Sequence, residues 1–182
     1  KIDFILSDFN AISLHFSNYI NTANVDLNFR KSDFVPGNIQ SLVQTYEQNL
    51  DIPAEMIVYL RGDNRIFESS GYEPYSTFEA HKKQNLVMGQ FFSLLASTRI
   101  PTSIPLKAQA SSIPNGNHDA VAFYYPMPFL STIPQATVVF YLESFLLDEL
   151  YNQYGGEEAV ILYLMNSDGS IILTNSDCSD SG

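Results

Sequence analysis

The sequence has 182 residues, of which 45% are hydrophobic and 13% aromatic, so it can build a packed core and is not disordered throughout. This length fits one domain and part of a second, but not two complete domains. Nine basic and 20 acidic residues leave a net charge of −11 and a pI near 4.4, and such a surface repels phosphate. The composition therefore excludes nucleic-acid binding by this chain and stable attachment to an anionic lipid surface.

The sequence contains neither a membrane-spanning segment nor a disulfide pair. No run of apolar residues approaches the length of about 18 that a transmembrane helix needs. No basic segment followed by an apolar stretch is present, so no export signal is predicted within the chain. The single cysteine, Cys178, lies in a polar tail and cannot pair within the chain. The chain starts with Lys1 and stops just after a predicted hairpin, and we expect it to be part of a longer protein.

The first segment, residues 1–24, is predicted to be an amphipathic signalling helix. Its apolar residues recur at alternating intervals of three and four, the spacing of a helix that lies along a partner helix. These residues are Ile2, Ile5, Phe9, Ile12, Phe16 and Tyr19. We expect the helix to continue from a membrane span and to form a homodimer, with Phe9 and Phe16 packed against the second copy. The alternative is a helix that packs only on the core of its own domain.

A second helix is predicted from the spacing of apolar residues between positions 39 and 50. Pro36 and Gly37 indicate a loop before it, and Asn38 is a suitable N-cap residue. The expected apolar face consists of Ile39, Leu42, Val43, Tyr46 and Leu50. Pro53 ends the helix because proline cannot continue the backbone hydrogen-bond ladder.

Two β-hairpins are predicted, one in the first half of the chain and one near its end. Residues 56–60 form a buried strand, and an Asp-Asn turn leads to the antiparallel strand at residues 65–69. Residues 159–165 and 170–174 form the second hairpin around an Asn-Ser-Asp-Gly turn. The repetition suggests two related α/β modules in tandem, of which the second is only begun.

The middle of the chain combines one helix with irregular segments. Residues 72–78 are aromatic and rich in turn formers, and residues 86–95 are predicted to be helical. Pro101, Pro105 and Pro114 keep the following stretch irregular, as is common in binding loops over a sheet.

Two strands and a helix complete the predicted domain. Residues 120–125 and 136–142 are the strands, and three prolines bound the loop between them. Ser144 caps a helix that extends to Tyr154, where two glycines end it. The predicted fold class is therefore α+β, with a long N-terminal helix and a central antiparallel sheet flanked by helices.

Several segments resemble the double Cache family, the extracellular PAS-like sensor domains of many bacterial receptors. Residues 136–143, ATVVFYLE, lead through a Ser-capped helix and two glycines to residues 160–172, VILYLMNSDGSII, in the order that joins a membrane-distal module to a membrane-proximal one. Residues 56–72, MIVYLRGDNRIFESSGY, are similar to the first hairpin of the distal module. The version found on membrane-anchored AraC-type transcriptional regulators is the most similar, and residues 91–101 and 124–128 fit it as well.

The resemblance implies a PAS-like/Cache sensor in three parts: a signalling helix at residues 1–24, a membrane-distal module at 25–154 and the beginning of a membrane-proximal module at 155–182. It implies a domain outside the cell membrane and a cytoplasmic effector beyond this chain, either an AraC-type DNA-binding regulator or a histidine kinase. Many amino-acid-binding members carry an Arg-x-Trp-Tyr cluster. This chain has no tryptophan and no arginine at residues 78–95, so no functional residue is carried over from that motif.

A ligand pocket is expected between the distal sheet and the helix and loops that cover it, as an apolar concavity with a few polar groups. The candidate ligand-binding residues lie on or beside predicted strands and are Tyr59, Tyr72, Tyr75, Phe78, Asp119 and Tyr124. A tyrosine ring offers a stacking face and one hydroxyl, which suits sugars or flat polar ligands. The alternative for each aromatic residue is a place in the hydrophobic core.

Signals for catalysis and metal binding are weak in this sequence. The three histidines are far apart, and none has a second ligand at metal-binding spacing beyond the neighbouring pair His118 and Asp119. Cys178 lacks the signature of a catalytic thiol, and neither a Gly-x-Ser-x-Gly elbow nor a phosphate-binding glycine loop is present. Residues 61–63, Arg-Gly-Asp, are interpreted as a turn between strands. We therefore predict no metal, no cofactor and no enzymatic activity.

These observations favour a noncatalytic extracytoplasmic sensor of an unknown small molecule. The ligand would bind two arrangements of the distal module with different affinities and so shift the population that the N-terminal helix reports. Two alternatives from other classes remain: a fragment of a small α/β enzyme, which would need a polar cluster with perturbed pKa values, and a cell-surface interaction module without a small ligand.

Overall fold

The computed structural model describes residues 2–22, 36–50, 54–82, 89–106, 119–129, 131–143, 163–165 and 171–174. The helices are α1 (Ile2–Thr22), α2 (Pro36–Gln48), α3 (Tyr75–Lys82) and α4 (Gly89–Ser97). The strands are β1 (Glu55–Leu60), β2 (Arg65–Glu68), β3 (Gly71–Pro74), β4 (Thr102–Leu106), β5 (Ala120–Met127), β6 (Ala136–Glu143), β7 (Tyr163–Met165) and β8 (Ile171–Thr174).

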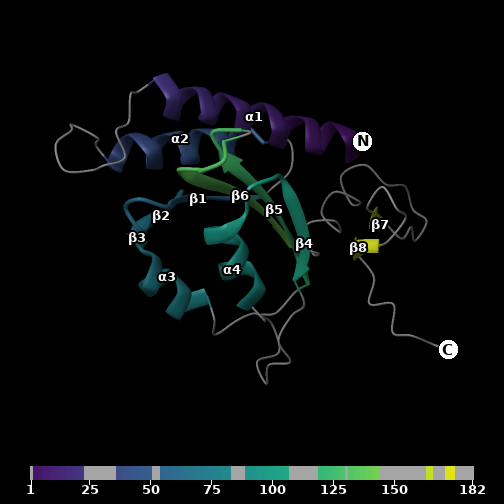
Figure 1. Ribbon diagram of the computed structural model, residues 1–182. Coiled ribbons are helices and arrows are strands. Elements are labelled where there is room, and N and C mark those ends of the chain that lie inside the picture. Colours follow the sequence, from purple (N-terminus) through teal and green to yellow (C-terminus); the bar gives the residue numbers. More distant parts are fainter. Residues whose placement is uncertain are drawn as a thin grey trace.

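The central sheet is antiparallel and has the strand order β3-β2-β1-β6-β5-β4, while β7 and β8 form a separate pair. Helices α1 and α2 lie side by side over one face of this sheet, and α3 and α4 cover the other (Figure 1). The predicted α+β class, with its long N-terminal helix and flanked antiparallel sheet, is confirmed. This is the arrangement that the PAS-like/Cache resemblance implies.

The inner strands are buried on both faces of the sheet, which explains why their sequences are continuously apolar rather than alternating. Successive side chains point to opposite faces and enter two separate cores. The α1-side core contains Phe9, Phe16, Ile20, Ile39, Val43, Ala54, Met56, Val58, Leu60, Phe67, Val121, Phe123, Tyr125, Met127, Ala136, Val138, Phe140 and Leu142. The α4-side core contains Ile57, Tyr59, Ile66, Phe78, Phe91, Phe92, Leu95, Ile104, Leu106, Ala120, Ala122, Tyr124, Val139 and Tyr141.

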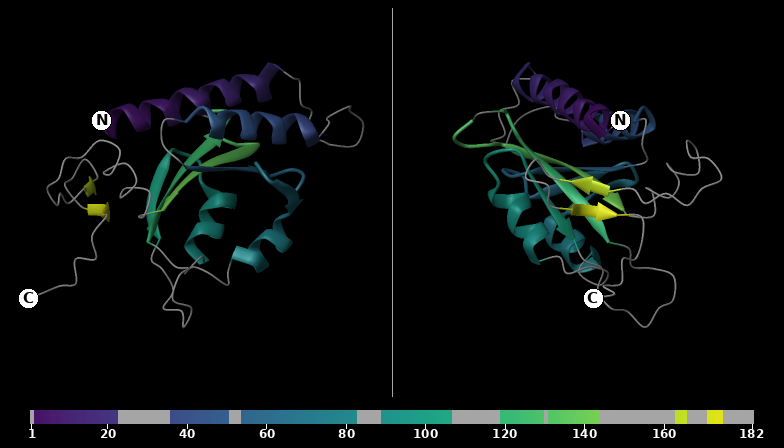
Figure 2. Two further views of the ribbon diagram at one scale, coloured as in Figure 1. Left: turned by 180° about the vertical axis from the view of Figure 1, so that it is seen from behind. Right: turned by 90° about the vertical axis from the view of Figure 1, so that its right-hand side faces the viewer.

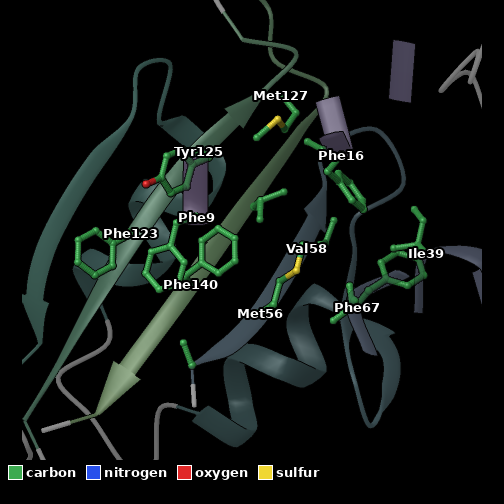
Figure 3. Close-up of a cluster of buried hydrophobic side chains, with 14 of the residues drawn as sticks. Phe9, Phe16, Ile39, Met56, Val58, Phe67, Phe123, Tyr125, Met127 and Phe140 are labelled. Carbon is green, nitrogen blue, oxygen red and sulfur yellow. The ribbon is translucent and has the colours of Figure 1, made fainter. Parts of the chain in front are cut away.

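The helix predicted at the start of the chain is confirmed as α1, but its apolar face does not pack against a second copy of the chain. Phe9 and Phe16 are fully buried within the chain itself. The ring of Phe9 stacks on Phe140 of β6, with centroids 4.2 Å apart and planes 4° from parallel (Figure 3). The prediction that Phe9 and Phe16 pack against a second copy is therefore wrong, because the sheet of the same chain already covers them. Both residues instead fit the alternative of a helix resting on its own core.

Helix α2 confirms the predicted apolar face and begins earlier than expected. It starts at Pro36, where the sequence predicts a loop, because proline suits the first turn of a helix, whose N–H groups lack intrahelical partners. Ile39 and Val43 are buried in the α1-side core. The Glu47 carboxylate accepts a hydrogen bond from the backbone N–H of Met56 at 2.6 Å, which ties α2 to β1.

The prolines of the middle segment do not prevent strands from forming there. The stretch predicted to be irregular contains β4, which tolerates Pro105 because β4 is an edge strand. Similarly, β5 continues through Pro126 to Met127 instead of ending at Tyr125. The pairing of β4 with β5 ends at Tyr124, so Pro126 has a neighbouring strand on only one side.

Residues 72–78, predicted to be turn-rich, contribute to β3 and to α3. Helix α3 has only eight residues, and Tyr75 and Phe78 are its only large apolar side chains. Two apolar residues three positions apart are too few for their spacing alone to predict a helix.

The hairpin predicted near the end of the chain is confirmed in the part that the structure describes, where Tyr163 pairs with Thr174 and Leu164 with Leu173. Strand β8 contacts β4 and β5 of the central sheet. Figure 2 shows this hairpin at the end of the molecule where α1 begins. The predicted helix at 144–154 lies outside the described residues, as do His118 and Cys178. Among the helices described above, none is both long and apolar enough to cross a bilayer.

Candidate functional site

The α3 and α4 side of the sheet gathers four of the six predicted ligand-binding residues. Tyr59 on β1, Tyr124 on β5 and Phe78 on α3 belong to the α4-side core, and Tyr75 packs against it. The ring centroids of Tyr59 and Tyr75 are 5.2 Å apart, and Tyr75 meets Phe92 edge-on at 5.7 Å. The sheet and α3 therefore place these aromatic rings in one continuous cluster.

Burial separates the cluster into core and rim positions. Phe78 and Tyr124 are 1% and 0% exposed, and the Tyr124 hydroxyl donates to the backbone carbonyl of Phe91 at 3.4 Å. Burial raises the pKa of Tyr124 far above its usual value, so this hydroxyl stays protonated. Tyr75 is only partly buried, and its hydroxyl donates to the carbonyl of Phe92 at 3.3 Å. Tyr75 therefore marks the rim where solvent reaches the cluster.

Tyr72 lies on the opposite side of the sheet from this cluster. It is 51% exposed, and its ring centroid is 5.5 Å from that of Phe67 in the α1-side core. The guanidinium of Arg65 lies over the Tyr72 ring, 5.8 Å from its centroid. The structure thus places Tyr72 and Tyr75, three positions apart in sequence, on different faces.

Asp119 lies at the far end of the sheet from Tyr59. It directly precedes Ala120, which pairs with Glu143, whereas Tyr59 pairs with Thr137. Those two positions on β6 are separated by a strand length of roughly 20 Å. Asp119 and the aromatic cluster are therefore not brought together.

A polar group on the α4 side contains residues that the sequence did not indicate as a site. Arg61 directly follows β1, and its Nε and Nη2 atoms donate to the Thr137 hydroxyl at 3.2 and 2.8 Å. Nη2 also donates to the backbone carbonyl of Thr98, after α4. The Thr137 hydroxyl donates to the carbonyl of Leu95 at 2.8 Å and is completely buried. We refer to Arg61, Thr137, Thr98 and Leu95 as the Arg61 clamp.

The Arg61 guanidinium is a partly buried positive charge in an acidic protein. Burial lowers the pKa of Arg61, the neighbouring Tyr59 raises it, and Arg99 lowers it again. Arginine nevertheless keeps its proton in proteins, so the group remains a cation. The sequence signal that could have indicated it is an arginine directly after a buried strand, in a chain with 9 basic and 20 acidic residues.

The histidines whose side chains are described take part in local contacts. His15 on α1 hydrogen-bonds the Tyr46 hydroxyl on α2, and His81 faces the Glu73 carboxylate at 3.4 Å. Across the described ranges of the chain, no three His, Cys, Asp or Glu side chains are grouped closely enough to hold a metal ion.

Comparison with solved structures finds several similar chains, among them two structures of one chemoreceptor domain. The ligand-binding domain of the Campylobacter jejuni chemoreceptor Tlp3 in complex with L-valine has a TM-score of 0.49 and 9% sequence identity, over 93% of this chain and 65% of that one. The sensory domain of Tlp3 (CcmL) with isoleucine bound has a TM-score of 0.46 and 10% identity, over 93% and 64%. The chain thus spans just under two thirds of the length of these domains. No family model and no curated protein matches the sequence.

Proposed function

We propose that this chain is the ligand-sensing part of an extracytoplasmic domain in a bacterial transmembrane signalling protein. The observation that carries the proposal is the alternation of side chains between the two cores. Tyr124 of the α4-side core lies between Phe123 and Tyr125 of the α1-side core, and Val139 directly precedes Phe140. Because cores are close-packed, a shift of the strands caused on the α4 side also moves the surface on which α1 rests.

The proposed mechanism needs no covalent chemistry. A small molecule binds at the rim marked by Tyr75, beside the buried Tyr59, with higher affinity for one of two arrangements of the sheet and α1. A coupling free energy of about 1–3 kcal/mol is usual for such a mechanism. Phe9, stacked on Phe140, gives α1 a direct contact with the moving strand.

The division into a signalling helix at 1–24, a membrane-distal module at 25–154 and the beginning of a membrane-proximal module at 155–182 is part of this proposal. The position of the β7–β8 hairpin near the beginning of α1 supports it, because connections to a membrane would then leave the molecule on one side (Figures 1 and 2). The proposed location is the outside of the cell membrane, and the proposed effector is an AraC-type transcriptional regulator, with a histidine kinase as the alternative.

The sensor proposal predicts stabilisation by a small molecule. In a thermal-shift screen of sugars, organic acids and other polar metabolites, we expect at least one compound to raise the Tm, since a ligand at about 100 times its Kd adds about 2.7 kcal/mol. Tyr75→Ala should reduce this shift, whereas the matched variant Tyr72→Ala, on the other face, should preserve it. The proposal fails if no compound stabilises the domain, or if both variants respond alike.

We also propose a homodimer through α1, using its outer face. Leu14 is 54% exposed, and Ser7, Ala11 and Asn18 are exposed at the intervals of four, three and four residues that place them beside it. Small side chains beside one leucine allow a second copy of α1 to approach closely. The sheet-facing residues, by contrast, have no room for a partner.

Cysteine cross-linking distinguishes the two faces of α1. In a Cys178→Ser background, Leu14→Cys should form disulfide-linked dimers under mild oxidation. Ser13→Cys is the control because Ser13 is fully buried on the sheet-facing side and the substitution changes little in size. Equal cross-linking of the two variants, or none in Leu14→Cys, would argue against this dimer.

A further inference from the structure

The Arg61 clamp uses only part of the hydrogen-bonding capacity of its guanidinium. Arginine carries N–H donors on each of its side-chain nitrogens. In the described part of the chain, Nε and Nη2 bond to Thr137 and Thr98, and no protein partner is found for Nη1. These bonds also hold the group in one orientation, so little side-chain freedom is left to lose when a ligand binds.

No carboxylate of the described residues neutralises Arg61. Asp63, in the same turn, forms its ion pair with Arg65 instead. The electrostatic partners that act on Arg61 are Tyr59 and a second cation, Arg99, which directly follows the clamp residue Thr98.

Other acidic side chains near the sheet interact with other residues or lie far from Arg61. Glu73 faces His81, and Glu79 acts on Tyr75, whose pKa is raised by burial first and by that carboxylate second. Burial, followed by the carboxylates of Glu143 and Glu55, raises the pKa of Tyr141. These groups lie at the end of the strands opposite Arg61. None of these carboxylates is therefore the counter-charge of Arg61.

We infer that Arg61, supported by Arg99, binds a carboxylate of the sensed molecule, so that the ligand is a small organic anion. This inference rests on the proposed sensor function and names its ligand class. A carboxylate oxygen can accept from the N–H groups of Nη1 and supplies the charge that a partly buried cation lacks. Tyr59 lies two positions before Arg61, and the partly buried ring of Tyr75, 5.2 Å from that of Tyr59, offers an apolar surface for the body of the ligand.

The test measures binding of acetate, lactate, succinate and citrate by calorimetry and thermal shift, beside the neutral analogues acetamide and succinamide and inorganic phosphate. We expect at least one carboxylate to bind, and its amide not to bind. Arg61→Gln should weaken that binding at least about tenfold, because a charged hydrogen-bonded contact is lost. Arg65→Gln removes the same charge from the other face and should leave the affinity unchanged.

A second variant keeps the inference testable if Arg61→Gln folds poorly. Arg99 is exposed, so Arg99→Gln should retain the fold and still weaken carboxylate binding several-fold. Arg61→Lys keeps the charge but cannot reproduce the bonds of the guanidinium to Thr137 and Thr98 that orient it, and should bind more weakly than the native chain. Binding of carboxylates that is indifferent to Arg61→Gln and Arg99→Gln would overturn the inference, as would binding of phosphate alone.

The failure of this inference can be separated from the failure of the proposed function. If only neutral compounds bind, and Tyr75→Ala weakens them, the domain is a sensor and the anion assignment is wrong. If no compound of either kind binds, both the assignment and the sensor proposal fall.

Discussion

Phe140→Ala is expected to destabilise the domain by about 3–5 kcal/mol, as is usual when a fully buried phenylalanine is truncated. Phe140 lies on the inner strand β6, is completely buried and stacks on Phe9 at 4.2 Å (Figure 3). Its ring also meets Tyr125 edge-on, with centroids 5.8 Å apart. The substitution therefore removes contacts to α1 and to β5 at once and leaves a cavity between them.

Urea denaturation followed by circular dichroism measures this loss. The matched control is Leu14→Ala, which truncates an exposed apolar side chain of α1 and should change the free energy of unfolding by less than about 0.5 kcal/mol. We also expect faster amide hydrogen exchange in α1 of the Phe140→Ala variant, because the helix loses its main aromatic contact. A loss no larger than that of the control would contradict the packing of α1 described here.

Thr137→Val is expected to cost about 1–3 kcal/mol, although the two side chains have nearly the same shape. The hydroxyl of Thr137 donates to the Leu95 carbonyl and accepts from Arg61, and it is fully buried. Valine would leave both of these polar partners without their bond. The expected cost is large for a substitution of equal volume because burying an unsatisfied polar group is unfavourable.

A double-mutant cycle with Arg61→Met measures how much of this cost belongs to the clamp. The effects of the two substitutions should not be additive, with a coupling free energy of about 0.5–3 kcal/mol, since both act on one hydrogen-bonded group. Thr102→Val is the control, because Thr102 bonds only locally, to the carbonyl of Ile100 at 3.2 Å. Additive effects, or an equal loss in Thr102→Val, would show that the clamp does not act as a unit.

Residue type and local pattern predicted the positions of the aromatic candidate residues only in part. Tyr59, Tyr75, Phe78 and Tyr124 were selected because they lie on or beside strands, and they do share one face of the sheet. Tyr72 was selected on the same grounds and lies on the other face. Side chains alternate between the two faces of a strand, so residues three positions apart point to opposite faces. The sequence predicted turns rather than β3 at this position and therefore did not separate Tyr72 from Tyr75.

The sequence by itself determined the α+β class, the two hairpins, the helical character of α1 and the burial of Phe9 and Phe16. These features follow from local periodicity and turn chemistry, which act between residues close together in the chain. The net charge of −11 further predicts that the chain does not bind nucleic acid.

Only the tertiary structure decided what covers the buried face of α1, because a/d spacing is the same whether a helix meets a second copy or its own sheet. It likewise decided that Pro105 lies in an edge strand and that Arg61 is part of a clamp. Arg61 meets Thr137 and Thr98 across 76 and 37 positions of the sequence. Such contacts arise from strand order and helix packing, which no short stretch of sequence specifies.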